Sequence, residues 1–159
     1  MTGRVVLPPV TKVLAEHLHR LVASFSGWTG RELLAAPRSP SELAERLFEA
    51  PFVLLSHGTE ADPILNYGNR MALTLWETDW ERFTRTPSRL TAEPLAREER
   101  ARALAAVASR GYTDDYRGVR ISLAGRRFRI ERAVVWTVVD ADEYCHGQAA
   151  MFERWTYLE

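Results

Sequence analysis

The sequence has 159 residues, 46% of them hydrophobic and 26% charged, which is the size and composition of one globular domain. Its 21 Lys and Arg residues balance 21 Asp and Glu residues, so the net charge gives no reason to expect binding to nucleic acid or anionic membranes. Cys145 is the only cysteine, which excludes an intrachain disulfide and a cysteine-based metal site. Without a signal-peptide core or the roughly 20 apolar residues of a membrane helix, we expect a soluble cytoplasmic protein.

The first third of the chain carries two helical patterns. Apolar residues at helical spacing form one stripe, which consists of Leu14, Leu18, Leu21 and Phe25. The segment "SPSELAERLFEA" has Ser39 as an N-cap, Pro40 at the first helical position and Glu42 to complete a capping box. We therefore expect residues 1–50 to form an N-terminal helical extension.

Strands and short helices are predicted after residue 51. The segments "FVLLSH" and "PILNYG" have the composition of strands, and Asn69 is a good N-cap for "RMALTLWE". A second short helix is predicted at "DWERF". A long helix follows, with Pro94 in its first turn and Gly111 at its C-terminal end.

The last third is rich in strands. Residues 116–140 show two alternating runs joined by a turn at Ala124-Gly125, and "YCHGQAAMFERWTYL" is a third long strand. Together with the two earlier strands, these predict a five-stranded antiparallel sheet with the short helices and the long helix on one face. Residues 51–159 are thus expected to form an α+β domain, in one compact unit with the extension.

This order of elements resembles the PAS fold, and "ILNYGNRMALTLWE" resembles the strand-to-helix passage of PAS domains. More closely, "APFVLLSHGTEADPILNYGN", "WTGREL", "RLTAEP", "REERARAL", "GVRIS" and "AVVW" together resemble the MEKHLA family of PAS-related domains, from about His17 to Tyr157. The literal Met-Glu-Lys-His-Leu-Ala string is absent. This favours the bacterial stand-alone form over the form at the C-terminus of plant homeodomain–leucine-zipper factors.

The resemblance implies a PAS-like sensing domain with a pocket between sheet and helices, but no catalytic or ligand residues can be transferred from the family. The sequence contains neither homeodomain nor zipper, so DNA binding is not implied. The region "FTRTPSRL" lacks the reactive cysteine of flavin photoreceptors. The long helix lacks the histidine of oxygen-sensing haem proteins, so both cofactors are disfavoured.

Arg132 interrupts an alternation of apolar residues in the predicted hairpin. These residues are Phe128, Ile130, Val134, Trp136 and Val138. If the alternation holds, the Arg132 guanidinium points inward, where a charge needs a carboxylate or an anionic ligand. A β-bulge, or a side chain extending past the sheet edge, would instead place the charge in solvent.

Three aromatic residues, Trp76, Trp136 and Tyr67, belong either to the core or to a stacking platform for a ligand. PAS domains often present a polar side chain from the closing strand to the ligand, so the resemblance makes Gln148 a candidate contact. If the inward face of that strand is instead the one with Cys145, Gln148 points to water.

His57, Glu60 and Asp62 follow the first predicted strand closely. An imidazole and two carboxylates could bind a divalent metal ion there, and a solvated turn is the alternative. Arg89 precedes the long helix, where PAS domains often gate the pocket, or else it is an ordinary surface residue.

The favoured interpretation is a PAS-like sensor without catalysis that binds an acidic or aromatic small molecule. Its candidate ligand contacts are Arg132, Trp136, Gln148, Tyr67, Trp76, Arg89 and His57. The alternatives are a protein–protein interaction module with a filled core and a metal-dependent enzyme using His57, Glu60 and Asp62. The N-terminal stripe either covers the far face of the sheet or pairs with a second copy, and we expect a homodimer through this helix, with neither nucleic acid nor membrane as a partner.

Overall fold

The computed structural model describes residues 5–159, but of residues 94–96 it describes only the backbone. The α+β class is confirmed, with the following elements in chain order: α1 (Lys12–Thr29), α2 (Pro40–Phe48), β1 (Val53–His57), β2 (Leu65–Gly68), α3 (Arg70–Leu75), α4 (Trp80–Phe83), the 3-10 helix η1 (Ser88–Thr91), α5 (Pro94–Arg110), β3 (Tyr112–Ile121), β4 (Arg127–Val139), β5 (Cys145–Phe152) and β6 (Arg154–Tyr157).

The strands form one antiparallel sheet in the order β2-β1-β5-β4-β3, and β6 pairs with β4. The predicted last strand is interrupted at Glu153, so within residues 5–159 the sheet has six strands where five were expected. The long strand β5 lies in the middle of the sheet, between β1 and the predicted hairpin of β3 and β4.

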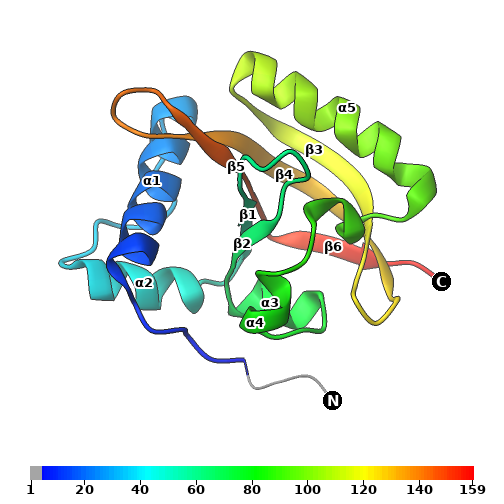
Figure 1. Ribbon diagram of the computed structural model, residues 1–159, viewed down its shortest axis with the longest axis horizontal. Helices are drawn as coiled ribbons and strands as arrows, with labels where there is room; N and C mark the ends of the chain where they lie inside the picture. The colour runs from blue at the N-terminus through cyan, green and yellow to red at the C-terminus, as the bar shows by residue number, and fades with distance from the viewer. Residues whose placement is uncertain (1–4) are drawn as a thin grey trace.

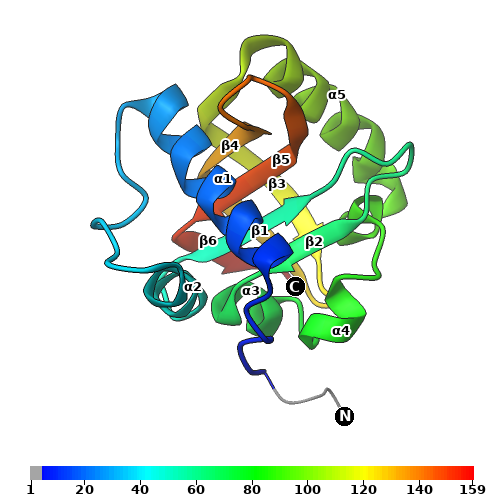
Figure 2. The same cartoon turned by 60° about the vertical axis from the view of Figure 1, so that its left-hand side comes forward.

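Helices cover both faces of this sheet, with α1 on one side and α5 on the other (Figures 1 and 2). Leu18, Leu21 and Phe25 of the α1 stripe are buried and Leu14 is partly buried. The ring of Phe25 meets that of Trp136 edge-on at 5.0 Å. The stripe thus covers the far face of the sheet, the first of its two predicted roles. None of the helices described has both the length and the apolar character to span a membrane.

The helical segment and the sheet share a hydrophobic core, because α1 and α2 residues pack in one cluster with Leu54 and Trp136. The division into residues 1–50 and 51–159 stays a prediction, and residues 1–4 lie outside the described part. The homodimer also stays a prediction. A second copy would have to contact residues of α1 outside the stripe, such as the exposed Val13.

Asn69 fixes the start of α3 and joins it to the rest of the fold. Its side-chain oxygen accepts from the backbone N–H groups of Ala72 and Leu54, each at 3.1 Å. Its amide nitrogen donates to the carbonyl oxygens of Leu47 and Phe52 at 3.1 and 2.8 Å. The predicted N-cap is confirmed, and it also holds α2, β1 and α3 together.

A β-bulge at Arg132, which has φ 52°, changes the phase of β4. Two residues, Glu131 and Arg132, there face a single residue of β3. Before the bulge Phe128 packs toward α3, whereas after it Trp136 packs toward α1. Arg132 is exposed. The prediction that its guanidinium points inward was wrong, because the extra residue ends the alternation on which it depended.

Candidate functional site

A cavity of about 50 Å³ lies between the sheet and α5. Its walls come from β1, β3, β4 and β5 on one side and from η1 and α5 on the other. One buried water needs about 10–15 Å³ of such volume, so there is room for roughly three or four waters or for a small molecule of similar size. The core on this face of the sheet is therefore not completely filled.

Two arginines line this cavity, Arg100 from α5 and Arg120 from β3. Only 8% of the Arg120 surface is exposed. Burial, followed by the positive charge of Arg120, lowers the pKa of Arg100 to about 10. Within the described residues neither arginine forms an ion pair. No carboxylate of the described residues therefore lies within ion-pairing distance of these two charges.

Neutral groups hold both guanidinium groups in place. Arg120 donates from Nη2 to the Tyr116 hydroxyl at 2.6 Å and from Nη1 to the Val119 carbonyl at 2.9 Å. Gly118 makes the first contact possible, because a Cβ there would lie 2.7 Å from the Tyr116 hydroxyl. Arg100 donates to the hydroxyl of Ser88 in η1. These partners orient the two cations without neutralising them.

His57 and Gln148 are direct neighbours across the β1–β5 pair and line the cavity together. Gly147 brings the strands close at this point, since a Cβ there would lie 1.9 Å from the His57 carbonyl oxygen. Gln148 Nε2 donates to the Leu104 carbonyl of α5 at 2.9 Å. Gln148 thereby connects the centre of the sheet to the helix that closes the cavity.

Three buried polar atoms of cavity-lining residues have no hydrogen-bond partner among the described residues: His57 Nε2, Gln148 Oε1 and Trp76 Nε1. Burial lowers the pKa of His57, so its ring is neutral near pH 7. Buried polar atoms are normally paired, since an unpaired one costs about 1–3 kcal/mol. Their concentration around one cavity indicates a place where a polar molecule is held.

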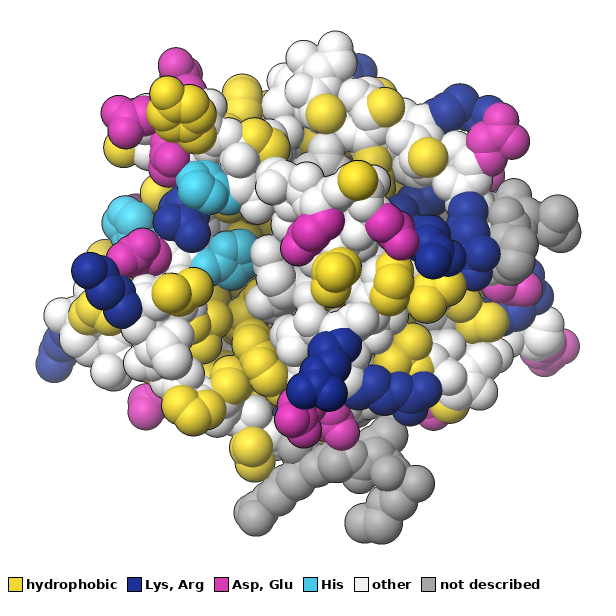
Figure 3. Space-filling view, viewed as in Figure 1, with side chains coloured by type: hydrophobic (Ala, Val, Ile, Leu, Met, Phe, Trp, Pro, Cys, Tyr) yellow, Lys and Arg dark blue, Asp and Glu magenta, His cyan; other side chains and the backbone are white. Residues whose placement is uncertain are grey.

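A second hollow of about 220 Å³ lies outside the cavity, between α5 and β3. It shares Arg100, Tyr116 and Arg120 with the inner cavity, and Arg117 and Arg129 line its outer part. Figure 3 shows basic side chains gathered on the side of α5. Arg100, Tyr116 and Arg120 thus line both the cavity and this hollow, to which Glu99 also contributes a carboxylate.

The structure brings together three of the predicted contacts, His57, Trp76 and Gln148. Trp136 instead faces α1, where its Nε1 donates to Ser24 Oγ at 3.1 Å. Tyr67 is fully buried on that same side. These two belong to the core, and neither lines the cavity.

Arg89 lies on the surface, half exposed, and forms an ion pair with Asp62 at 3.2 Å. The predicted metal ligands do not converge, because Asp62 pairs with Arg89 while Glu60 accepts from the Ile64 N–H at 3.2 Å. His57 lines the cavity instead. In the described part of the chain no three His, Cys, Asp or Glu side chains form a group that could hold a metal ion.

Arg100 and Arg120 were missed by the sequence analysis. Arg120 pairs with Phe128 across the hairpin, and Phe128 is a core residue. Counting back from the predicted turn at Ala124-Gly125 would have placed Arg120 on the same face as Phe128. No sequence signal identifies Arg100, because α5 has many charged residues and a weak apolar stripe.

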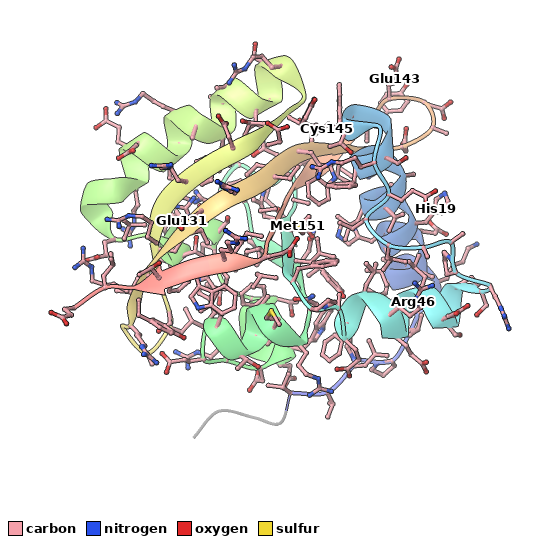
Figure 4. All side chains as sticks on the ribbon, turned by 180° about the vertical axis from the view of Figure 1, so that it is seen from behind. His19, Arg46, Glu131, Glu143, Cys145 and Met151 are labelled. Atoms are coloured by element: carbon pink, nitrogen blue, oxygen red, sulfur yellow. The ribbon has the colours of Figure 1, made fainter. Side chains whose placement is uncertain are left out.

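A wider groove of about 940 Å³ lies on the α1 side, between α1, residues 37–40 and the β4–β5 connection. His19 and Glu143 stand on its two sides, as seen from behind in Figure 4. Its lining carries charges of both signs, including Glu16, Arg20 and Asp140. It is open to solvent and lacks the uncompensated charge found in the cavity near α5.

Comparison with known families identifies the family to which the chain belongs. The model of the MEKHLA domain matches residues 15–157, nearly the whole sequence. The chain belongs to the MEKHLA domain family. This MEKHLA domain is 26% identical over 143 residues to the homeobox-leucine zipper protein ATHB-9 of Arabidopsis thaliana, covering 87% of the chain and 17% of the relative.

It is also 26% identical over 156 residues to the homeobox-leucine zipper protein HOX29 of Oryza sativa subsp. indica, covering 96% of the chain and 18% of that relative. The chain thus spans less than a fifth of these relatives. Both are plant proteins, so the bacterial stand-alone form stays a prediction.

Solved structures show that the MEKHLA domain has a PAS-like fold. The PAS domain of a Colwellia psychrerythraea protein superposes with a TM-score of 0.60 at 14% identity, covering 70% of this chain and 92% of the other. A light-oxygen-voltage domain studied with a flavin analogue gives a TM-score of 0.55 at 14% identity, covering 74% and 84%. The predicted PAS-like fold is confirmed.

The light-oxygen-voltage neighbour raises the question of a flavin. Pockets that hold drug-sized ligands measure about 300–1,000 Å³, far more than the cavity of about 50 Å³ in the MEKHLA domain. Cys145 is exposed and does not line the cavity. The residues present do not fit a flavin.

Proposed function

We propose that this MEKHLA domain is a PAS-like sensor module that binds a small acid, without catalysis, in the cavity between the sheet and α5. The observation that carries the proposal is the pair of cavity-lining arginines, the half-buried Arg100 and the buried Arg120, neither of which pairs with a carboxylate of the described residues. A bound anion would provide that missing charge.

Physical chemistry favours an anion over a neutral ligand. A buried charge without a partner is destabilising, and two like charges beside one cavity add repulsion. A carboxylate accepts charge-assisted hydrogen bonds from guanidinium groups, which are about twice as strong as neutral ones. Because Arg100 lies on α5 and Arg120 on β3, one acid would also fasten the helix to the sheet. Fastening α5 to the sheet in this way would signal that the cavity holds a ligand.

The alternative of an interaction module with a filled core is less well supported, because unpaired polar atoms surround a real cavity. The metal-dependent enzyme lacks its predicted ligand cluster in the described residues.

Thermal unfolding of the purified chain in acetate, propionate, glycolate or L-lactate, each against chloride at equal ionic strength, tests the proposal. At a hundredfold excess over Kd we expect a Tm rise of about 5–10 °C. Arg120→Leu should abolish that rise. The control Arg85→Leu removes an exposed arginine that pairs with Glu81, and should keep it. No acid-specific rise for the wild-type chain, or an equal rise in Arg120→Leu, contradicts acid binding at this site.

A further inference from the structure

The hydrogen-bonding atoms of the cavity specify more about the ligand than its charge, and this inference rests on the proposed function. The carbonyl oxygen of Leu104 can only accept, so the atom of Gln148 that contacts it must be the donating Nε2. The unpartnered atom is therefore Oε1, an acceptor. Gln148 is 8% exposed, so this acceptor is shielded from bulk water.

His57 offers a second acceptor. Its Nδ1 lies 3.0 Å from the carbonyl oxygen of Gly58, which can only accept, so Nδ1 carries the proton. In the neutral ring Nε2 is then a bare acceptor, and it is buried without a partner. Since His57 and Gln148 are paired across β1 and β5, the two acceptors belong to the same part of the wall.

The remaining polar groups of the wall are donors. Arg100 and Arg120 carry N–H groups and positive charge, and the indole N–H of Trp76 is buried and unpartnered. A plain carboxylic acid would satisfy donors only and would leave both acceptors unpaired or hydrated. A ligand that matches the whole wall needs an anionic group and also an O–H or N–H donor.

An ammonium group is the wrong donor for this site. It would bring a third positive charge close to the two arginines, and a zwitterion has no net charge with which to compensate them. A hydroxyl group donates without charge. The volume limits the ligand to a few non-hydrogen atoms.

We propose that the cavity binds a small hydroxy acid, with the carboxylate held by Arg100 and Arg120 and the hydroxyl donating to Gln148 Oε1 or His57 Nε2. The carboxylate accounts for the charge of the site, and the hydroxyl accounts for one of the two acceptors on the neighbouring strands β1 and β5.

Isothermal titration calorimetry of the full chain with matched probes tests this class. Glycolate and acetate differ by one oxygen, as do L-lactate and propionate; glycine replaces the hydroxyl by an ammonium, and ethylene glycol lacks the carboxylate. We expect each hydroxy acid to bind at least about tenfold more tightly than its partner. Glycine and ethylene glycol should show no binding.

Gln148→Met removes the acceptor but keeps the length of the side chain. The substitution also removes the bond to the Leu104 carbonyl, so the readout is the ratio of the two affinities: the preference for glycolate over acetate should fall below about threefold. An unchanged preference would overturn the role of Gln148. If this variant does not fold, the wild-type comparison still decides the ligand class.

The outcomes separate the two proposals. Equal binding of acetate and glycolate, or of propionate and L-lactate, overturns the hydroxy acid and leaves acid binding intact. Binding of ethylene glycol or glycine as tight as that of glycolate overturns the charge argument. No binding by any acid overturns both proposals.

Discussion

The α1 face of the sheet and the α5 face are built differently. Under α1, apolar side chains pack around Trp136, Trp136 is paired with Ser24 and His17 with Ser56. On this face Arg20 Nε and Tyr67 Oη are buried without partners among the described residues. Under α5, two arginines lack a carboxylate and three polar atoms lack partners. Val107 is the only buried side chain among those described in α5. One face is packed mainly with apolar side chains that stabilise the fold, while the other carries the unpaired charges on which the proposed acid binding rests.

Hydrogen exchange should show the largest difference between the two faces. Because α5 buries so little apolar surface, its amides should open locally with a free energy about 3 kcal/mol below that of α1. This corresponds to about a hundredfold lower protection. Addition of glycolate should raise the protection of α5 and leave that of α1 unchanged. Equal protection of both helices without ligand would remove the distinction between the faces.

Truncation of buried side chains should follow the same division. Phe25→Ala removes a ring packed edge-on against Trp136, and we expect a loss of about 3–5 kcal/mol in the free energy of unfolding. Val107→Ala on α5 should cost about 1–2 kcal/mol, because it removes two methyl groups beside a face that is already loosely packed. Urea denaturation measures both values. Similar losses for the two variants would contradict the difference in packing.

The pH dependence of stability should reveal the contribution of His17, which lies on the α1 face. Burial, followed by the charge of Arg20, lowers the pKa of His17 to about 4. The unfolded chain takes up this proton near pH 6.5, so the contribution of His17 is complete above that pH and is lost as the pH falls toward 4. Between pH 7 and 5, wild type should lose about 2 kcal/mol more than His17→Gln.

The exposed His19 on the same helix provides the control. His19→Gln should keep the wild-type dependence on pH. His57 also has a lowered pKa and adds to the fall in every variant, so the comparison between variants isolates His17. An identical fall in wild type and His17→Gln would show that the buried ring does not control acid stability.

Local sequence signals predicted the helices better than they predicted the site. The caps at Ser39 and Asn69 act through hydrogen bonds to residues three positions away, so the sequence alone reveals them. The break in alternation at Arg132 allowed a bulge as one of several interpretations, and only the pairing of β3 with β4 decides for it. His57 and Gln148 meet because β1 and β5 are adjacent although distant in the sequence. Three of the seven predicted ligand contacts therefore line the cavity. The two arginines that line it were not predicted, because in the sequence their positions resemble ordinary polar surface.

The free energy of unfolding of Arg100→Met, measured with and without glycolate, tests the central claim most directly. In chloride we expect a variant at least as stable as wild type, by up to about 1 kcal/mol, because a half-buried charge without a carboxylate partner is replaced by an apolar side chain. With glycolate at a hundredfold excess over its Kd, wild type should gain about 2.7 kcal/mol and the variant almost nothing, so the order of stability reverses. A variant that is clearly less stable in chloride, together with equal responses to glycolate, would contradict the account.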